Sequence, residues 1–163
     1  MNSDRISSRA LGLFDEGFHC SQAVFCAVAE ALSLQAGEVR AVAASLSPFG
    51  GGMGSSGNVC GNLSGALAVL GVLMGKREPK LQDDKNIWRA SNRMVRKFEE
   101  ITKEYGGMNC RDIARIDWRS REDVKAFRTD PNSRKRECCR VMDKTVRSLV
   151  EILKELQAIH SVP

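Results

Sequence analysis

Apolar residues recur along this chain at intervals of three and four, which is the spacing of one face of an α-helix. The pattern predicts a series of helices over residues 7–17, 20–32, 37–46, 60–75, 84–105, 111–116, 121–127 and 136–158. No stretch shows the sustained alternation of apolar and polar residues that is typical of strands. We therefore expect an all-α fold.

The stretch over residues 60–75 is the most apolar of these predicted helices. Its apolar positions are Leu63, Ala66, Leu67, Leu70, Leu73 and Met74, and nothing polar interrupts residues 66–74. A helix that is apolar on every side is normally buried. A glycine-rich loop, residues 49–57, leads into it. We expect a bundle of about five to seven helices around this buried central helix.

Composition indicates the number of domains and the cellular compartment. The chain has 163 residues, of which 42% are hydrophobic, and this favours one domain over residues 1–163. No secretory signal is visible at the start, and the longest apolar run is shorter than the ~20 residues of a membrane span. We therefore expect a cytoplasmic protein without a membrane partner. In that compartment six cysteines point to metal binding, redox chemistry or burial rather than to a disulfide framework.

Charge is distributed unevenly along the chain. Residues 1–75 carry three basic and five acidic side chains, a net −2, and residues 76–163 carry 22 basic and 15 acidic ones, a net +7. Because the two signs are interleaved and no nucleic-acid motif is present, we expect a solvated surface and no nucleic-acid partner. A Gly-x-Gly-x-x-Gly match at residues 52–57 lacks the preceding strand that a dinucleotide site needs.

The cysteines supply the candidate chemistry. Cys20, Cys60, Cys110 and the pair Cys138–Cys139 each lie at or near a predicted helix start. Helix starts carry partial positive charge, so their convergence would suit thiolates or the anionic core of an iron–sulfur cluster. Their wide spacing matches no short zinc or ferredoxin motif. Cys26 lies within a predicted helix and is expected to be an apolar filler.

Several motifs together carry a resemblance to a known family. They are residues 19–24 (HCSQAV), 49–52 (FGGG), 60–67 (CGNLSGAL) and 105–111 (YGGMNCR), with Phe98 and a cysteine that opens the last helix. With them the chain resembles the C_GCAxxG_C_C family of small redox-active proteins, which have four characteristic cysteines. The resemblance assigns these four positions to Cys20, Cys60, Cys110 and Cys138. Cys139 stays open as an alternative to Cys138.

The resemblance also implies a cofactor. The family is similar to the non-haem part of split-Soret cytochromes, which implies an iron–sulfur site, here a 2Fe–2S cluster, with zinc as the alternative. Haem is not expected, because the chain has no Cys-x-x-Cys-His and His19 and His160 lie far apart. His19 could also be a ligand, a proton donor or an exposed loop residue.

Backbone N–H groups and one side chain complete the expected site. Those groups belong to Gly51, Gly52 and Gly61, and we expect them close to the sulfurs, where such bonds raise a cluster's reduction potential. Asn62 stands where the Cys-Gly-Ala-x-x-Gly pattern has alanine. Its side chain could donate a hydrogen bond to a sulfur or face solvent.

Three functions remain open at this stage. The first is electron transfer or redox sensing through a four-cysteine iron–sulfur site, with an unidentified redox partner protein and a cluster that two subunits of a homodimer could share. The second is a metal-free thiol–disulfide oxidoreductase in which Cys60 is the attacking thiolate. The third is a structural zinc or ligand-binding module.

Overall fold

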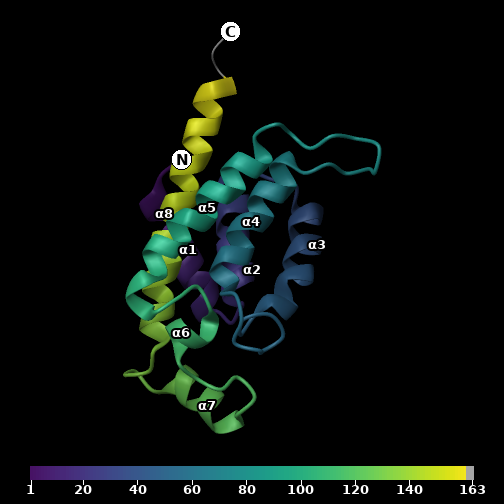
Figure 1. Cartoon of the computed structure of the whole chain (residues 1–163). Helices are drawn as coiled ribbons and strands as arrows, with labels where there is room; N and C mark the ends of the chain where they lie inside the picture. Colours follow the sequence, from purple (N-terminus) through teal and green to yellow (C-terminus); the bar gives the residue numbers. More distant parts are fainter. Residues whose placement is uncertain (161–163) are drawn as a thin grey trace.

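The computed structural model describes residues 1–160, and the side chains of residues 1–157, so the side chain of His160 lies outside the described residues. Within this range the chain forms eight α-helices and two short 3₁₀ turns and no strand (Figure 1). They are α1 (Ser3–Asp15), α2 (Cys20–Ala31), α3 (Ala36–Leu46), η1 (Ser47–Phe49), α4 (Gly61–Met74), α5 (Ile87–Thr102), η2 (Lys103–Tyr105), α6 (Cys110–Ala114), α7 (Arg121–Thr129) and α8 (Lys135–His160).

The all-helical prediction is confirmed, and the described helices number eight rather than five to seven. The number exceeds seven because the short segments predicted over residues 111–116 and 121–127 each form a separate helix, α6 and α7. α2 packs most extensively against α4, α1 packs against both α2 and α8, and α5 packs against α4 and α8. α6, α7 and the glycine-rich loop gather at one end of this bundle (Figure 1). No described helix is long and apolar enough to span a bilayer.

The most deeply buried helix is α2, and this corrects the prediction that residues 60–75 form the central helix. Nine consecutive residues of α2, from Ser21 to Ala29, are buried. α4 is buried over its first turns, but Gly71 is exposed and Leu73 is 41% exposed. The apolar run of α4 is thus longer than the surface that its neighbours cover. α2 is packed by α1, α3, α4 and α8, and its small side chains allow them to approach.

The start of α2 is fixed by close packing and by two buried hydrogen bonds. A Cβ atom at Gly65 of α4 would overlap the carbonyl oxygen of Ser21, so only glycine permits this approach. The Ser21 hydroxyl donates to the Leu46 carbonyl at 2.9 Å, and the Gln22 amide donates to the Ala43 carbonyl at 3.0 Å. These contacts hold Cys20, the first residue of α2, close to the start of α4.

The face that α5 buries differs from the predicted one at Trp88. The buried residues of α5 are Ala90, Met94, Phe98 and Thr102, which are four apart and form one stripe. Trp88 lies two residues before Ala90, which turns its side chain away from the stripe by about 200°. Its side chain is 75% exposed. The apolar spacing of residues 84–105 places Trp88 on the same face as Met94 and Phe98, and the structure shows that this prediction is wrong.

Candidate functional site

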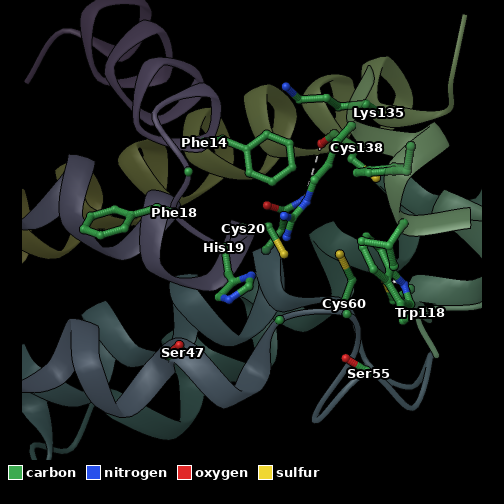
Figure 2. A pocket seen from close by; sticks show the side chains of 18 of the residues that line it. Phe14, Phe18, His19, Cys20, Ser47, Ser55, Cys60, Trp118, Lys135 and Cys138 are labelled. Carbon is green, nitrogen blue, oxygen red and sulfur yellow. Dashed lines mark hydrogen bonds between the residues drawn. The ribbon is translucent and has the colours of Figure 1, made fainter. Parts of the chain in front are cut away.

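A cavity of about 440 Å³ lies at the end of the bundle where α2, α4, α6 and α8 begin. Cys20, Cys60, Cys110 and Cys138 all line it, although up to 118 residues separate them in the sequence. Figure 2 shows the sulfurs of Cys20 and Cys60 facing the same space. The geometry brings together the four cysteines that the family resemblance assigns, and their role as ligands stays a prediction.

The other two cysteines do not line this cavity. Cys26 is buried within α2, as expected of an apolar filler. Cys139 is half-buried, and its pKa is raised by burial and by the carboxylate of Asp15. Of the Cys138–Cys139 pair, Cys138 is thus the residue that lines the cavity with the other three.

The four cysteines of the cavity lie at helix starts, as predicted. Cys20 is the first residue of α2, Cys60 is the N-cap of α4, Cys110 is the first residue of α6, and Cys138 is the fourth residue of α8. Turn-forming segments precede each of them, and this is the local signal that the sequence carries. The arrangement places backbone N–H groups of α2 and α4 next to the sulfurs.

A short antiparallel pairing joins two of the cysteines, and sequence analysis did not predict it. Val59 and Asn109 form an isolated β-bridge. On either side of it, Cys60 N–H donates to the Met108 carbonyl at 3.0 Å, and Cys110 N–H donates to the Asn58 carbonyl at 2.7 Å. The bridge thus sets Cys60 beside Cys110. It is a single pair of residues, too short to leave an alternating pattern in the sequence.

The glycine-rich loop packs closely against Cys110 beside the cavity. Gly52 has a φ of +73°, and a Cβ there would lie 2.7 Å from the Cβ of Cys110. The hydrogen bonds recorded for the N–H groups of this loop run to oxygen atoms, for example from Gly57 to Gly51 at 3.0 Å. That the N–H groups of Gly51 and Gly52 donate to a sulfur stays a prediction. Gly51 lines the cavity.

The pKa values of the Cys20 and Cys60 thiols shift in opposite directions. The Cys60 thiol donates a hydrogen bond to the Cys20 sulfur, which is the largest cause that lowers the pKa of Cys20. Backbone N–H groups of Ser21, Cys20 and Gly61 lower it further, against the opposing effect of burial. The pKa of Cys60 is raised well above its ordinary value, because Cys60 is the donor, is buried and faces the other sulfurs. These opposite shifts favour ionisation of Cys20 over ionisation of Cys60.

Gly61 is the position where the expected backbone contact is found. A Cβ atom at Gly61 would lie 2.6 Å from the Cys20 sulfur, far inside van der Waals contact. Glycine therefore lets the first turn of α4 approach the sulfur closely, and the Gly61 N–H lowers the pKa of Cys20. The predicted approach to a sulfur is thus found at Gly61, and for Gly51 and Gly52 it stays a prediction.

Burial and the nearby Cys20 sulfur raise the pKa of each of the remaining two thiols. Burial and the Cys20 charge raise the pKa of Cys110 to about 12. Burial raises the pKa of Cys138 well above its ordinary value, and the charges of Cys20, Cys110 and Cys139 add to this. Of the four cysteines, Cys20 is therefore the one whose pKa is lowered. A metal centre would let all four sulfurs ionise, because its positive charge offsets their mutual repulsion.

Trp118 is a further member of the site. Its indole N–H donates to the Cys110 sulfur at 3.1 Å, and this bond opposes the rise in the pKa of Cys110. The ring of Trp118 meets the ring of Phe127 edge to face, with centroids 5.0 Å apart. Eight residues separate Trp118 from Cys110, and no spacing rule in the sequence connects them.

Asn62 is fully buried and lines the cavity, so the alternative that it faces solvent is wrong. Its amide nitrogen donates to the Cys138 carbonyl at 3.5 Å, and its carbonyl oxygen, Oδ1, has no hydrogen-bond partner.

Lys135, Asp15 and His19 also line the cavity. Lys135 pairs with Asp15 at 2.7 Å and lies over the Phe14 ring at 5.5 Å, while His19 is exposed beside Gly50.

The donor set indicates which metal groups could fit. Among the described residues no three cysteine, histidine or carboxylate side chains stand close enough together to hold one metal ion. A tetrahedral zinc site needs its four ligands around a single point. The four cysteines line one cavity, and within the described residues they do not form such a group. Four cysteines are a donor set of iron–sulfur ligation, and Asp15 and His19 line the same cavity.

Comparisons with known proteins agree with the cysteine arrangement. A relative from Archaeoglobus fulgidus, described as an uncharacterized protein, is 29% identical over 120 residues, which cover 68% of this chain and 75% of the relative. No solved structure matches the chain. The family described as "Putative redox-active protein (C_GCAxxG_C_C)" matches residues 18–152. This match covers most of the chain and all four cysteines of the cavity, so the chain belongs to the C_GCAxxG_C_C family.

Proposed function

We propose that the protein carries or senses electrons through a 2Fe–2S cluster held by Cys20, Cys60, Cys110 and Cys138. The observation that supports the proposal most is that these four cysteines line one cavity, while Cys26 and Cys139 do not. When bound, such a cluster supplies a centre that gains and loses one electron. A redox partner protein supplies or takes that electron.

The residues of the chain would tune this centre. Backbone N–H groups of Cys20, Ser21 and Gly61 approach the Cys20 sulfur, and the Trp118 indole donates to the Cys110 sulfur. Hydrogen bonds to cluster sulfurs stabilise the added negative charge and raise the reduction potential. The aromatic side chains of Phe14, Trp118 and Phe127 would limit the access of water. We therefore expect a potential above that of an unprotected cluster.

The test is the visible spectrum of anaerobically purified protein, with iron, zinc and acid-labile sulfide counted per chain. Matched iron and sulfide with absorption bands between about 320 and 600 nm are expected of sulfur-ligated iron. Serine substitutions at Cys60 and Cys110 should abolish the bands, while Cys139→Ser, the matched control next to Cys138, should keep them. A Cys60→Ser variant that retains a full cluster would contradict the proposal, as would protein that stays iron-free after reconstitution.

A second candidate function rests on the contact between Cys20 and Cys60. The Cys20 thiolate would attack a substrate disulfide, forming a mixed disulfide and releasing one substrate thiol. The Cys60 thiol, after losing its proton to solvent, would then displace the second substrate thiol. The products are a Cys20–Cys60 disulfide and a substrate reduced by two electrons.

This candidate predicts a different result on metal-free protein. After mild oxidation the chain should lose two free thiols and regain them with dithiothreitol, and peptide mapping should place the disulfide between Cys20 and Cys60. Cys20→Ser should abolish the reaction. Zinc in place of iron, at one per chain, would favour neither function and would point to a structural metal site.

A further inference from the structure

The cysteine cavity opens to solvent where side chains of its lining are exposed. Phe18 and Arg128 both line the cavity, and both are exposed. A protein that exchanges electrons with the site has to come close to the sulfurs, and this exposed part of the lining allows it to do so. The inference below concerns this surface, and the electron exchange in it rests on the proposed function.

Most of the excess positive charge of the chain lies in the segment that borders this opening. Residues 111–140 carry ten basic and six acidic side chains, a net +4, whereas the rest of the chain carries 15 basic and 14 acidic ones, a net +1. Residues 111–140 include most of α6, all of α7 and the start of α8. An excess of exposed cations beside the cavity would attract an acidic protein.

Three cations of α7 form a stripe beside the cavity. Arg121, Lys125 and Arg128 are exposed, and because they are four and three residues apart they share one face of the helix. Val124 and Phe127, which line the cavity together with Arg128, lie on the adjoining face. Figure 1 shows α7 at the outer end of the bundle, beyond the other helices. The stripe is thus open to solvent next to the cavity.

The three cations of this stripe have no ion pair within the part of the chain that the structure describes. By contrast, Lys135, Arg136 and Arg140 of α8 each pair with a carboxylate. Of the two carboxylates of α7, Asp123 accepts hydrogen bonds from residues 117 and 120, and Glu122 lies about 100° around the helix from the nearest cation of the sequence. The stripe is therefore available to carboxylates of another protein.

Two exposed apolar side chains lie at the same end of the molecule. Phe18 is 39% exposed, and Met53 is 43% exposed in the loop whose Gly51, Gly54 and Ser55 line the cavity. The φ of Met53 is +59°, a left-handed conformation that is strained for a long side chain and is retained mostly at functional positions. Aromatic residues, methionine and arginine are the types that protein interfaces favour.

We propose that a docking face made of Phe18, Met53, Arg121, Lys125 and Arg128 binds an acidic one-electron carrier protein. Carboxylates of the carrier would pair with the three cations, and apolar side chains of the carrier would pack on Phe18 and Met53. One electron then passes between the cluster and the carrier, so that one is oxidised and the other is reduced. The six acidic side chains within residues 111–140 disfavour a nucleic acid, because they would repel its phosphates.

The first experiment measures docking and needs no metal. The probe is a fluorescein-labelled peptide of repeated Glu-Glu-Leu-Glu units, and fluorescence anisotropy follows its binding to the full chain at low and high salt. The triple variant Arg121→Gln/Lys125→Gln/Arg128→Gln should bind the peptide about tenfold more weakly at low salt and lose most of the salt dependence.

The control is the triple variant Lys76→Gln/Lys80→Gln/Lys85→Gln. It changes three exposed lysines in the loop between α4 and α5, at the end of α4 that is remote from the cavity. Because it removes the same total charge, it separates the local effect of the stripe from the effect of net charge. This variant should keep the peptide affinity, and equal losses in the two triple variants would overturn the proposal.

Met53→Gly separates docking from folding. Glycine adopts the left-handed conformation without strain, so the variant should unfold at the same temperature or a higher one. It should nevertheless bind the peptide severalfold more weakly, because the exposed side chain is lost. An unchanged affinity would remove Met53 from the docking face.

The second experiment tests electron exchange on cluster-loaded protein whose iron and sulfide are counted. The reduced protein is oxidised in separate stopped-flow runs by hexacyanoferrate(III), an anion, or by hexaamminecobalt(III), a cation. The ratio of the anion rate to the cation rate at low ionic strength should fall about tenfold in the α7 variant and stay unchanged in the lysine control. A ratio that the α7 substitutions do not change would contradict electron exchange at this face.

Two further outcomes decide between the possible occupants and between the two proposals. Tighter binding of an oligothymidylate of the same length as the peptide, or of phosphatidylglycerol vesicles, would overturn the proposal and indicate a nucleic-acid or membrane surface. Protein that never acquires iron would contradict the proposed function, whereas the peptide experiment would still test the docking face.

Discussion

Tyr105 is the single tyrosine of the chain, and it donates its hydroxyl to Glu137 at 2.9 Å. Burial and this carboxylate raise the pKa of Tyr105 from 10.0 to about 12. The neutral phenol is thus favoured in the folded state. This contribution to stability is fully present below pH 10 and is lost as the pH rises from about 10 to about 12.

The raised pKa of Tyr105 is tested by titration of the tyrosinate absorbance at 295 nm in metal-free protein. The folded chain should titrate near 12 and the chain in urea near 10. Glu137→Gln should lower the folded midpoint, because it removes the negative charge beside the phenol. A folded midpoint near 10, with circular dichroism showing that the helices persist, would mean that the Tyr105–Glu137 contact does not exist in solution.

Gly61 and Gly71 offer a matched pair of glycine-to-alanine substitutions in α4. An alanine at position 61 would press on the Cys20 sulfur, whereas position 71 has open space around the new methyl group. Gly61→Ala should reduce the iron content severalfold and destabilise the fold by about 1–3 kcal/mol. Gly71→Ala should keep the iron and stabilise the fold by about 0.5–1 kcal/mol. Urea unfolding and iron analysis measure both effects, and equal iron content in the two variants would contradict the role of Gly61.

At the scale of residues, the sequence predicts where the cysteines stand but not which atoms they meet. A turn followed by an apolar helical pattern places Cys20, Cys60 and Cys110 at helix starts. The direction of the Cys60–Cys20 hydrogen bond, which lowers the pKa of Cys20 and raises that of Cys60, depends on positions in space. The same holds for Trp118, whose contact with Cys110 depends on the path of residues 115–120.

At the scale of elements, two substitutions in α5 test which face of this helix is buried. Phe98 is fully buried and Trp88 is 75% exposed, although both are large aromatic residues on one helix. Phe98→Ala should lower the free energy of unfolding by about 3–5 kcal/mol, and Trp88→Ala should change it by less than about 0.5 kcal/mol. Urea unfolding followed by circular dichroism measures both. A large loss of unfolding free energy in Trp88→Ala would show instead that Trp88 is packed in the core.

The helices themselves were largely predictable, because apolar spacing reports amphipathic helices directly. Burial of whole helices was harder to predict. α2 contains many alanines and appears less apolar than α4, yet it is the more deeply buried of the two. Small side chains let α1, α3, α4 and α8 approach α2, and this depends on the packing of distant segments. The β-bridge at Val59 and Asn109 is likewise a contact between segments 50 residues apart.

At the scale of the whole molecule, a cluster would cross-link four helices. α2, α4, α6 and α8 each bring one cysteine to the cavity, while α7 makes no extensive contact with another described helix. Removing the metal should therefore lower the melting temperature by about 10 °C, the effect of roughly 3–4 kcal/mol in a chain of this size. Hydrogen exchange should rise first in α6 and α7 and last in α2. An unchanged melting temperature after metal removal would contradict a cross-linking role.

The position of Cys138 in α8 has a consequence for synthesis of the protein. Cys20 and Cys60 leave the ribosome early, Cys110 follows, and the fourth sulfur arrives only with the last described helix. A chain interrupted before α8 has three of the four sulfurs and also lacks the helix on which α1 and α5 pack. If the cluster is bound as proposed, only chains that are translated beyond residue 138 bind it and absorb visible light. Iron delivered to a nascent chain would find no complete site until translation of α8 has begun.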